Sequence, residues 1–426
     1  MIEKLYQAFL KSSGVSTDTR TIEKGNIWFA LKGPNFEANK FADKALESGA
    51  SIVVIDDENY VKDERYFLVD DGLLALQQLA NHHRKQLDIP FLGITGSNGK
   101  TTTKELVRDV IAKKFHVLAT EGNLNNHIGV PLTVLRIDDS IEFAVIEMGA
   151  NAQQEIKLLC EIAEPDFGLI TNIGKAHLEG FGGLEGVFKG KTEMYDFLAS
   201  KKGKAFVNTD FPKLVEKLNA LDISMITYPN AGNDLELKLI NELPELEIEV
   251  GGESFITKIT GGYNAANIAV ALCVGQYFGV TSSDAISAVK TYDPDNNRSQ
   301  LIKIGSNTVV LDAYNANPSS MKEALKSFDK RASVNKMIIL GDMLELGEDS
   351  KKEHFVIGEL TETLKNTEVH FCGNEMSAAQ KGNSKSKYWA NKKDLAEFLK
   401  ARTFENTLFL IKGSRGMSLE TLLESL

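Results

Sequence analysis

The sequence predicts an α/β protein of three domains. Two observations carry that prediction: the chain has 426 residues, more than one hydrophobic core usually organises, and short apolar runs alternate with helical patterns along most of it. Such alternation is typical of parallel sheets with helices on both faces. We place the domain boundaries near residues 88 and 299. This gives a small N-terminal α/β domain (1–88), a central parallel-sheet domain (89–299) and a doubly wound, Rossmann-like C-terminal domain (300–426).

The composition limits the class of function. The net charge of −11 argues against a nucleic-acid-binding protein, which needs clustered Lys and Arg on its surface. The sequence contains no run of about 18 apolar residues, so it predicts no membrane span. Residues 1–6 lack the layout of a secretory signal. Three cysteines, Cys160, Cys273 and Cys372, share no metal-like spacing. We therefore expect a cytoplasmic protein, and we expect it to be a monomer.

The predicted elements follow in chain order. Apolar runs at 27–31 and 52–55 predict strands of the N-terminal domain. In the central domain the predicted strands are 91–95, 143–147, 167–171 and 205–208. Alternating residues at 246–250, the Gly251-Gly252 pair and the run 255–259 predict a hairpin at the periphery of the sheet, before a helix that includes residues 265–272. In the C-terminal domain the predicted strands are 309–312, 337–341, 369–372 and 408–411.

The strongest chemical signal is the glycine-rich segment 93–102 (GITGSNGKTT), which follows a predicted strand and opens a helix. In such a loop backbone N–H groups converge on phosphate oxygens, the Lys100 ammonium reaches the β- and γ-phosphates, and the Thr101 hydroxyl can bind Mg²⁺. The alternative is a flexible turn with a chance Gly-Lys-Thr. The residues predicted to bind ATP here are Gly96, Ser97, Asn98, Gly99, Lys100, Thr101 and Thr102.

The loop resembles that of the Mur ligases and the related folylpolyglutamate synthetases, which activate carboxylates. Nine further segments match the Mur ligase pattern in order and extend the resemblance over nearly the whole chain. They are 122–131 (GNLNNHIGVP), 147–149 (EMG), 171–178 (TNIGKAHL), 191–193 (KTE), 264–267 (NAAN), 297–298 (NR), 312–318 (DAYNANP), 341–347 (GDMLELG) and 412–415 (KGSR).

The resemblance implies two Mg²⁺ sites beside ATP, held by Thr101, Glu147, His177 and Lys191. Taken alone, Glu147 is an acid at a strand end, and His177 is more often structural than a ligand. Lys191 on its own would be interpreted as a solvated helix charge. In the family the matching lysine reacts with CO₂ to form a carbamate, which needs a neutral amine and supplies anionic oxygens.

Four further residues are implied to contact the nucleotide. Arg298 would neutralise charge on the transferring γ-phosphoryl group, and it joins Lys100, His177 and Lys191 as a candidate catalytic residue. Asn267, Asp312 and Asn315 would contact the rest of ATP, with Asp312 at the ribose hydroxyls. The alternative role for Asp312 is capping at a strand end.

Segments 16–20 (STDTR) and 25–33 (GNIWFALKG) resemble the UDP-binding part of one branch of the family. The residues implied to bind the UDP-linked substrate are Asp18, Thr19, Arg20, Leu31, Lys32, Asn123, Asn125 and Asn126. A helix cap with a surface ion pair is the alternative for Asp18 and Arg20.

That branch ligates D-alanyl-D-alanine to UDP-N-acetylmuramoyl-tripeptide through an acyl-phosphate, a step of peptidoglycan precursor synthesis. The motifs of the branch that adds the third amino acid, Asp-Tyr-Ala-His-Thr-Pro and Asp-Asn-Pro-Arg, do not occur here. The expected cofactors are ATP, two Mg²⁺ and CO₂ as the lysine carbamate. Two alternatives remain at this point: another amide ligase of the superfamily, adding the third amino acid or resembling folylpolyglutamate synthetase, and an ATP-binding regulatory protein.

Overall fold

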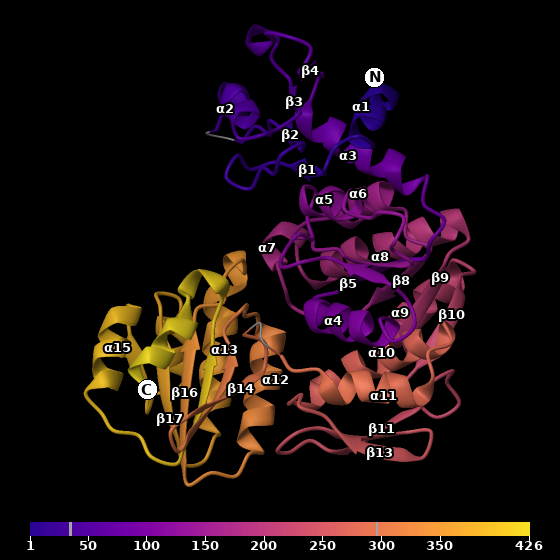
Figure 1. The fold of residues 1–426 in the computed structure, drawn as a ribbon. Coiled ribbons are helices and arrows are strands. Elements are labelled where there is room, and N and C mark those ends of the chain that lie inside the picture. Colours follow the sequence, from indigo (N-terminus) through magenta and orange to yellow (C-terminus); the bar gives the residue numbers. More distant parts are fainter. Residues whose placement is uncertain (34–35, 295–296) are drawn as a thin grey trace.

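A computed structural model describes residues 1–33, 36–294 and 297–426. The chain forms three lobes, with the N-terminal lobe at the top of Figure 1, the central lobe below it and the C-terminal lobe at the lower left. Both six-stranded sheets are α/β layers, which confirms the predicted fold class. None of the described helices is long and apolar enough to cross a membrane.

The N-terminal lobe is built on a four-stranded parallel sheet in the order β1-β2-β3-β4. Its strands are β1 (Val15–Ser16), β2 (Ile27–Phe29), β3 (Ile52–Ile55) and β4 (Tyr66–Leu68), and its helices are α1 (Ile2–Phe9), α2 (Ala42–Glu47) and α3 (Gly72–Arg84). Alternate residues of β3 enter two separate cores, because successive side chains of a strand point to opposite faces. Val53 belongs to the core formed with Trp28 and residues of α2, and Val54 belongs to the core formed with residues of α3.

The central lobe contains a six-stranded parallel sheet in the order β10-β9-β8-β5-β7-β6. Its strands are β5 (Phe91–Thr95), β6 (Val117–Ala119), β7 (Phe143–Glu147), β8 (Phe167–Ile170), β9 (Lys204–Asn208) and β10 (Ser224–Tyr228). Its helices are α4 (Lys100–Ile111), α5 (Gly129–Val134), α6 (Glu155–Ala163), α7 (Leu178–Phe181), α8 (Leu184–Lys201), α9 (Pro212–Ala220), α10 (Ala265–Tyr277) and α11 (Ser282–Thr291).

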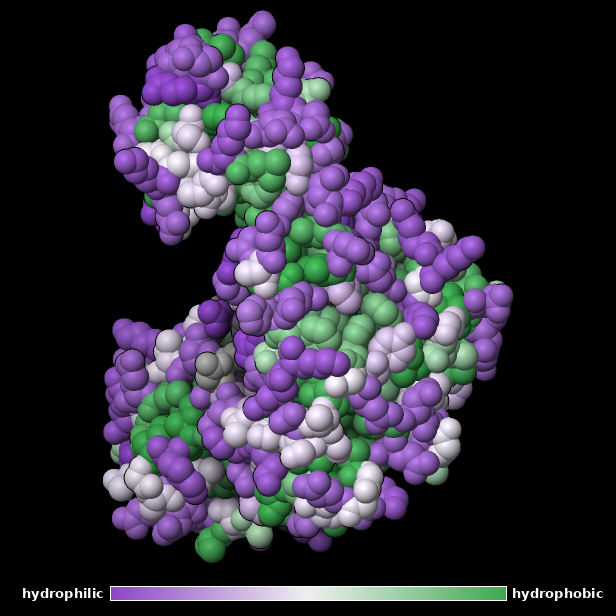
Figure 2. Space-filling view, turned by 45° about the vertical axis from the view of Figure 1, so that its right-hand side comes forward, coloured by the Kyte–Doolittle hydropathy of each residue, from purple (hydrophilic) through white to green (hydrophobic). Residues whose placement is uncertain are grey.

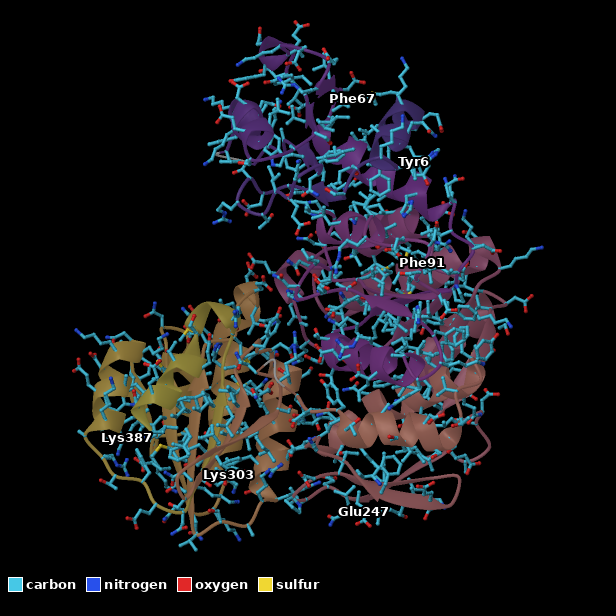
Figure 3. All side chains as sticks on the ribbon, viewed as in Figure 1. Tyr6, Phe67, Phe91, Glu247, Lys303 and Lys387 are labelled. Atoms are coloured by element: carbon cyan, nitrogen blue, oxygen red, sulfur yellow. The ribbon has the colours of Figure 1, made fainter. Side chains whose placement is uncertain are left out.

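Helices cover both faces of this sheet. Phe143 and Val145 of β7 pack in the core beneath α4 and α10, and Ala144 and Ile146 pack in the core beneath α6 and α8. Because β5 and β7 are buried on both faces, their residues are apolar except at the last positions, Thr95 and Glu147, and the side chains around Phe91 fill the lobe (Figure 3).

The predicted hairpin is present and forms part of a separate three-stranded antiparallel sheet below the central lobe (Figure 1). This sheet consists of β11 (Leu237–Asn241), β12 (Glu247–Val250) and β13 (Glu253–Ile256). Gly251 and Gly252 have φ angles of 59° and 82°. Two consecutive left-handed residues make the tight turn whose twist matches that of the strands, and glycine adopts them without steric cost.

The C-terminal lobe has a six-stranded sheet in the order β14-β15-β19-β16-β17-β18, parallel except for the β14–β15 pair. The strands are β14 (Gln300–Ile304), β15 (Asn307–Asp312), β16 (Asn335–Gly341), β17 (Thr367–Cys372), β18 (Lys387–Trp389) and β19 (Thr407–Lys412). The helices are α12 (Pro318–Asp329), α13 (Ser350–Glu362), α14 (Met376–Gly382) and α15 (Lys392–Lys400). Short 3₁₀ turns lie at Ala38–Phe41, Glu58–Tyr60, Gly262–Asn264, Gly347–Asp349, Arg415–Met417 and Leu419–Ser425.

Candidate active site

The predicted phosphate loop connects β5 to the first residue of α4. Two of its glycines have left-handed backbones, Gly96 with φ 141° and Gly99 with φ 81°. A Cβ atom on Gly96 would lie 2.0 Å from the Thr171 hydroxyl, and one on Gly99 would lie 2.7 Å from the Asn267 amide oxygen. Both positions therefore require glycine for their conformation and for the close approach of neighbouring elements.

The segment 171–177, which follows β8, holds the phosphate loop from one side. The Thr171 hydroxyl donates to the Asn98 carbonyl (2.6 Å), and the Asn98 N–H donates to the Asn172 side chain (3.0 Å). The Ser97 hydroxyl bonds to the backbone of Gly174, as donor to its carbonyl (3.1 Å) and as acceptor from its N–H (2.9 Å). These side-chain bonds fix a loop that would otherwise have few partners of its own.

The other end of the 171–177 segment contacts the C-terminal lobe. The Lys175 N–H donates to the Ser319 hydroxyl (3.0 Å), and its ammonium pairs with the Glu353 carboxylate (2.5 Å). The Nδ1 atom of His177 bonds to the Glu345 carboxylate. Both residues have left-handed backbones, with φ 52° at His177 and φ 63° at Glu345. The His177 bond lowers the pKa of Glu345. The segment is thus bonded at one end to the loop and at the other to a different lobe.

Two residues of the loop and helix, Lys100 and Thr101, face the carboxylate of Glu147 at the end of β7. The Thr101 hydroxyl lies 3.3 Å from Glu147 Oε1, which also accepts a bond from Asn125 (2.8 Å). Lys100 donates to the Gly96 carbonyl (2.8 Å), and burial lowers its pKa, against the opposing charge of Glu147.

Glu147 Oε2 is buried and accepts no hydrogen bond from any described residue. The Lys104 ammonium lies 3.9 Å from it, beyond hydrogen-bond range. A buried carboxylate oxygen without a partner is costly unless a cation completes it. The arrangement of Thr101 and Glu147 therefore fits a divalent cation with oxygen ligands, although no group of three or more His, Cys, Asp or Glu side chains in the described ranges forms a metal cluster by itself.

Lys191 is buried in α8, with 1% of its surface exposed. Its ammonium donates to the Ala150 carbonyl (3.1 Å) and lies 5.1 Å from the centre of the Phe181 ring. Burial lowers the pKa of Lys191 well below its usual value of 10.5, and the charge of Lys100 lowers it further. The interpretation of Lys191 as a solvated helix charge is excluded, and its amine has the lowered pKa that carbamate formation requires.

Residues of two other elements approach the loop from α10 and from the C-terminal sheet. Asn267 is buried, accepts a bond from the Thr103 hydroxyl (3.1 Å) and donates to Asn264 (2.8 Å). The Asp312 carboxylate at the end of β15 pairs with the Lys412 ammonium (2.6 Å). Among the described residues the Asp312 side chain bonds to this ammonium and makes no capping bond.

A cavity of about 1140 Å³ brings most of the predicted residues together at the carboxyl ends of the central strands, where open α/β sheets bind ligands. The predicted residues that line it are Ser97, Asn98, Gly99, Lys100, Thr101, Thr102, Asn123, Asn125, Asn126, Glu147, His177, Asn267, Arg298, Asp312 and Asn315. Gly96 and Lys191 do not line it. The amine of Lys191 lies behind the wall, because its acceptor Ala150 is a lining residue.

The predicted residues of the N-terminal lobe lie outside this cavity: Asp18, Thr19, Arg20, Leu31 and Lys32. Arg20 pairs with Asp18 (2.6 Å) on the surface and lowers the pKa of Asp18 to about 2. Lys32 pairs with Asp56 (2.9 Å). Figure 2 shows an open notch between the N-terminal and C-terminal lobes.

Sequence reasoning missed a group of lining residues beyond β8: Asn208, Asp210, Phe211, Pro229, Asn230, Leu237 and Leu239. Asn208 ends a strand that was predicted, so its place at the carboxyl edge could have been inferred. Pro229 and Asn230 follow β10, and Leu237 and Leu239 belong to β11. Neither strand was predicted from the sequence.

Comparisons with known proteins agree with this geometry. The model of the Mur ligase middle domain matches residues 94–275, and the model described as Mur ligase, glutamate ligase domain matches residues 297–415. A UDP-N-acetylmuramoyl-tripeptide–D-alanyl-D-alanine ligase of Bacillus subtilis (strain 168) is 36% identical over 97% of this chain and 93% of its own.

Two solved structures resemble the whole chain. The crystal structure of MurF from Acinetobacter baumannii has a TM-score of 0.88 at 29% identity and covers 100% of this chain and 98% of its own. The crystal structure of MurF ligase from Thermotoga maritima in complex with ADP has a TM-score of 0.87 at 28% identity and covers 98% of this chain and 97% of its own.

Proposed function

This chain belongs to the Mur ligase family, and from that premise we propose that its cavity joins D-alanyl-D-alanine to UDP-N-acetylmuramoyl-tripeptide with consumption of ATP. One observation carries the proposal. A single cavity joins a phosphate loop to residues of the C-terminal lobe, and relatives named for this reaction align along nearly the whole chain. The step belongs to peptidoglycan precursor synthesis.

The reaction proceeds in two displacements. A carboxylate oxygen of the tripeptide attacks the γ-phosphorus of ATP, ADP leaves, and an acyl-phosphate forms. The free amine of D-alanyl-D-alanine then attacks the acyl carbon, loses a proton and expels inorganic phosphate, which leaves the new amide. Lys100 and Arg298 both line the cavity, and their charges stabilise the transferring phosphoryl group.

Four residues would hold the two Mg²⁺ ions that the family fold implies. Thr101 and Glu147 would bind the first, as the unpartnered oxygen of Glu147 supports. His177 and the carbamate of Lys191 would bind the second, since the buried amine of Lys191 has a lowered pKa. The ions neutralise phosphate charge. Asn267, Asp312 and Asn315 hold the rest of the nucleotide, with the ribose at Asp312.

The N-terminal lobe holds the UDP end of the substrate through Asp18, Thr19, Arg20, Leu31 and Lys32, and Asn123, Asn125 and Asn126 hold the part that enters the cavity. The exposed guanidinium of Arg20 and ammonium of Lys32 suit a diphosphate.

The test is phosphate release by the purified protein with ATP, Mg²⁺, UDP-N-acetylmuramoyl-tripeptide and D-alanyl-D-alanine. We expect release only when all are present. Turnover with a UDP-linked dipeptide and a single amino acid, or with folate and glutamate, would instead show another ligase of the superfamily. Phosphate release from ATP alone would show a regulatory ATPase.

A Lys100→Ala variant provides the control for the phosphate loop. Its ammonium makes one bond, to the Gly96 carbonyl, so we expect the fold to survive, as measured by circular dichroism. Turnover should fall by about 10²-fold or more if Lys100 stabilises the transferring phosphoryl group. Near-normal turnover would contradict the assignment of this loop.

A further inference from the structure

Arg298 is an arginine of the cavity wall that has no anionic partner among the residues that the structure describes. It lines the cavity beside the phosphate loop, and its Nε is buried without a hydrogen-bond acceptor in the described ranges. Its guanidinium instead lies over the ring of Tyr314, 3.8 Å from the ring centre. A guanidinium stacked on a ring keeps its in-plane N–H donors free for a ligand.

The backbone around Arg298 is held in an uncommon conformation. Both neighbours, Asn297 (φ 57°) and Ser299 (φ 54°), are left-handed residues other than glycine, a conformation that asparagine adopts more readily than serine and that the surroundings of Ser299 must stabilise. Ser299 is bonded to the central lobe: its hydroxyl to Tyr263 (2.6 Å) and its carbonyl to Thr260 (3.3 Å). Strain of this kind persists where the structure fixes a side chain for a task.

Tyr314 reaches Arg298 because of the β14–β15 ladder. Gln300 pairs with Leu311 at the end of that antiparallel ladder, so Arg298 and Tyr314 lie just beyond it, two and three residues further along their chains. The Tyr314 ring also has a second cation near it, since the Arg415 guanidinium lies 5.6 Å from its centre. The C-terminal sheet thus carries the ring, and the ring fixes the plane of Arg298.

We propose that Tyr314 is a positioning residue that holds the Arg298 guanidinium, by stacking, in the orientation in which it receives the γ-phosphoryl group. The proposal rests on the proposed function, because it takes phosphoryl transfer as the reaction. Tyr314 acts through Arg298 and not through the base or ribose of the nucleotide. The stack therefore contributes to the transferring state more than to the binding of ADP, which lacks the γ-phosphoryl group.

The experiment compares Tyr314→Leu, Tyr314→Phe, Arg298→Ala and the Tyr314→Leu/Arg298→Ala double variant with the full-length wild type. We expect Tyr314→Leu to lower kcat by about 5- to 30-fold, the range that a cation–π contact gives. ADP affinity, measured by calorimetry, should stay within about two-fold. Tyr314→Phe keeps the ring and should be near wild type. In the Arg298→Ala background the Leu substitution should have no further effect on kcat, since the two residues act as one unit.

Phe398→Leu provides a matched control. Phe398 also lies under a guanidinium, that of Arg402 at 5.1 Å, but neither residue lines the cavity. The kcat of Phe398→Leu should equal that of the wild type. An Arg298→Lys variant covers the case in which Tyr314→Leu fails to fold: it leaves the ring intact and removes the planar group, so kcat should fall as in Tyr314→Leu.

Three outcomes would overturn the inference while the wild type turns over normally: a normal kcat in Tyr314→Leu or Arg298→Lys, equal losses in the Phe and Leu variants, or additive losses in the double variant. A large loss of ADP affinity in Tyr314→Phe would assign the tyrosine hydroxyl to the nucleotide instead. Absence of ligase turnover in the wild type would contradict the proposed function, which separates the two failures.

Discussion

Lys191 shows how a functional requirement works against stability at the scale of one residue. Within the described part of the chain its ammonium has one hydrogen bond, from Nζ to the Ala150 carbonyl, and no carboxylate pairs with it. Removing an ammonium group from water is costly when no anion compensates it. A methionine of similar length would fill the same space in α8 without this cost.

We predict that Lys191→Met is more stable than the wild type and inactive. In CO₂-free buffer the unfolded amine binds its proton up to pH 10.5, while the pKa of the folded amine is lowered. The unfolded wild type therefore carries more protons than the folded wild type, so the free energy of unfolding of the wild type rises with pH. The advantage of the variant should be ~1 kcal/mol or more at pH 7 and should shrink toward pH 10. Denaturant unfolding at both pH values measures it, and a difference that does not change with pH would contradict it.

Gly96 is a position of the phosphate loop where a single added carbon atom would clash with a neighbouring segment. We predict that Gly96→Ala abolishes nucleotide binding, because its Cβ would lie 2.0 Å from the Thr171 hydroxyl that holds Asn98. Gly305→Ala is the matched control: Gly305 has φ 57° and no atom within 4 Å of a built Cβ, so it tests the left-handed backbone without the clash. ADP titration distinguishes the two, and normal affinity in Gly96→Ala would show that the loop adapts.

At the scale of elements, the 171–177 segment connects the phosphate loop to the C-terminal lobe. We predict that Glu353→Ala, which removes the buried partner of Lys175, weakens ADP binding about 2- to 10-fold, although Glu353 does not line the cavity. Calorimetry measures the change. Asp196→Asn removes a pair of similar length with Lys217 (2.6 Å), more exposed to solvent and inside the central lobe, and should leave ADP affinity unchanged. Equal effects of both variants would contradict the connection.

The strands that the sequence predicted best are the buried ones. The bounds of β3, β5 and β7 agree with the predicted runs, because a buried strand of a parallel sheet is a nearly continuous apolar run, with Thr95 and Glu147 only at the last positions of β5 and β7. Strands β1, β4, β6, β10, β11, β14 and β18 were missed, because partly or fully exposed residues stand in each where a buried strand has a continuous apolar run. The phosphate loop could be predicted because local chemistry defines it. The Arg298–Tyr314 stack could not, because only the β14–β15 register brings those side chains together.

At the scale of the whole molecule, the candidate site needs two lobes. The cavity is lined from the central lobe and by Asp312, Tyr314 and Asn315 of the C-terminal lobe. We predict that a fragment ending near residue 299 lacks ligase activity, since it loses this wall, and that adding the separate 300–426 piece restores little activity because the effective concentration is lost. Full catalysis by the fragment would contradict a shared site.

The N-terminal lobe stands across the notch from this cavity (Figure 2). We predict that an ATP analogue and UDP-N-acetylmuramoyl-tripeptide together draw the lobes closer, as hinged closure around ligands does. Small-angle scattering should show a smaller radius of gyration than that of the free protein. An ATP analogue alone should change the radius of gyration less, because none of the residues predicted to bind ATP belongs to the N-terminal lobe. Unchanged dimensions with both ligands would show that the lobes are already in their working positions.

The dual bonding of the 171–177 segment also defines a way to inhibit the enzyme. A small molecule wedged between Lys175 and the C-terminal lobe would break the bonds to Ser319 of α12 and Glu353 of α13. The loop residues Ser97 and Asn98 would then lose the support that reaches them through Asn172 and Gly174. Such a compound would weaken nucleotide binding by removing the support of the loop, and it would not need to resemble ATP.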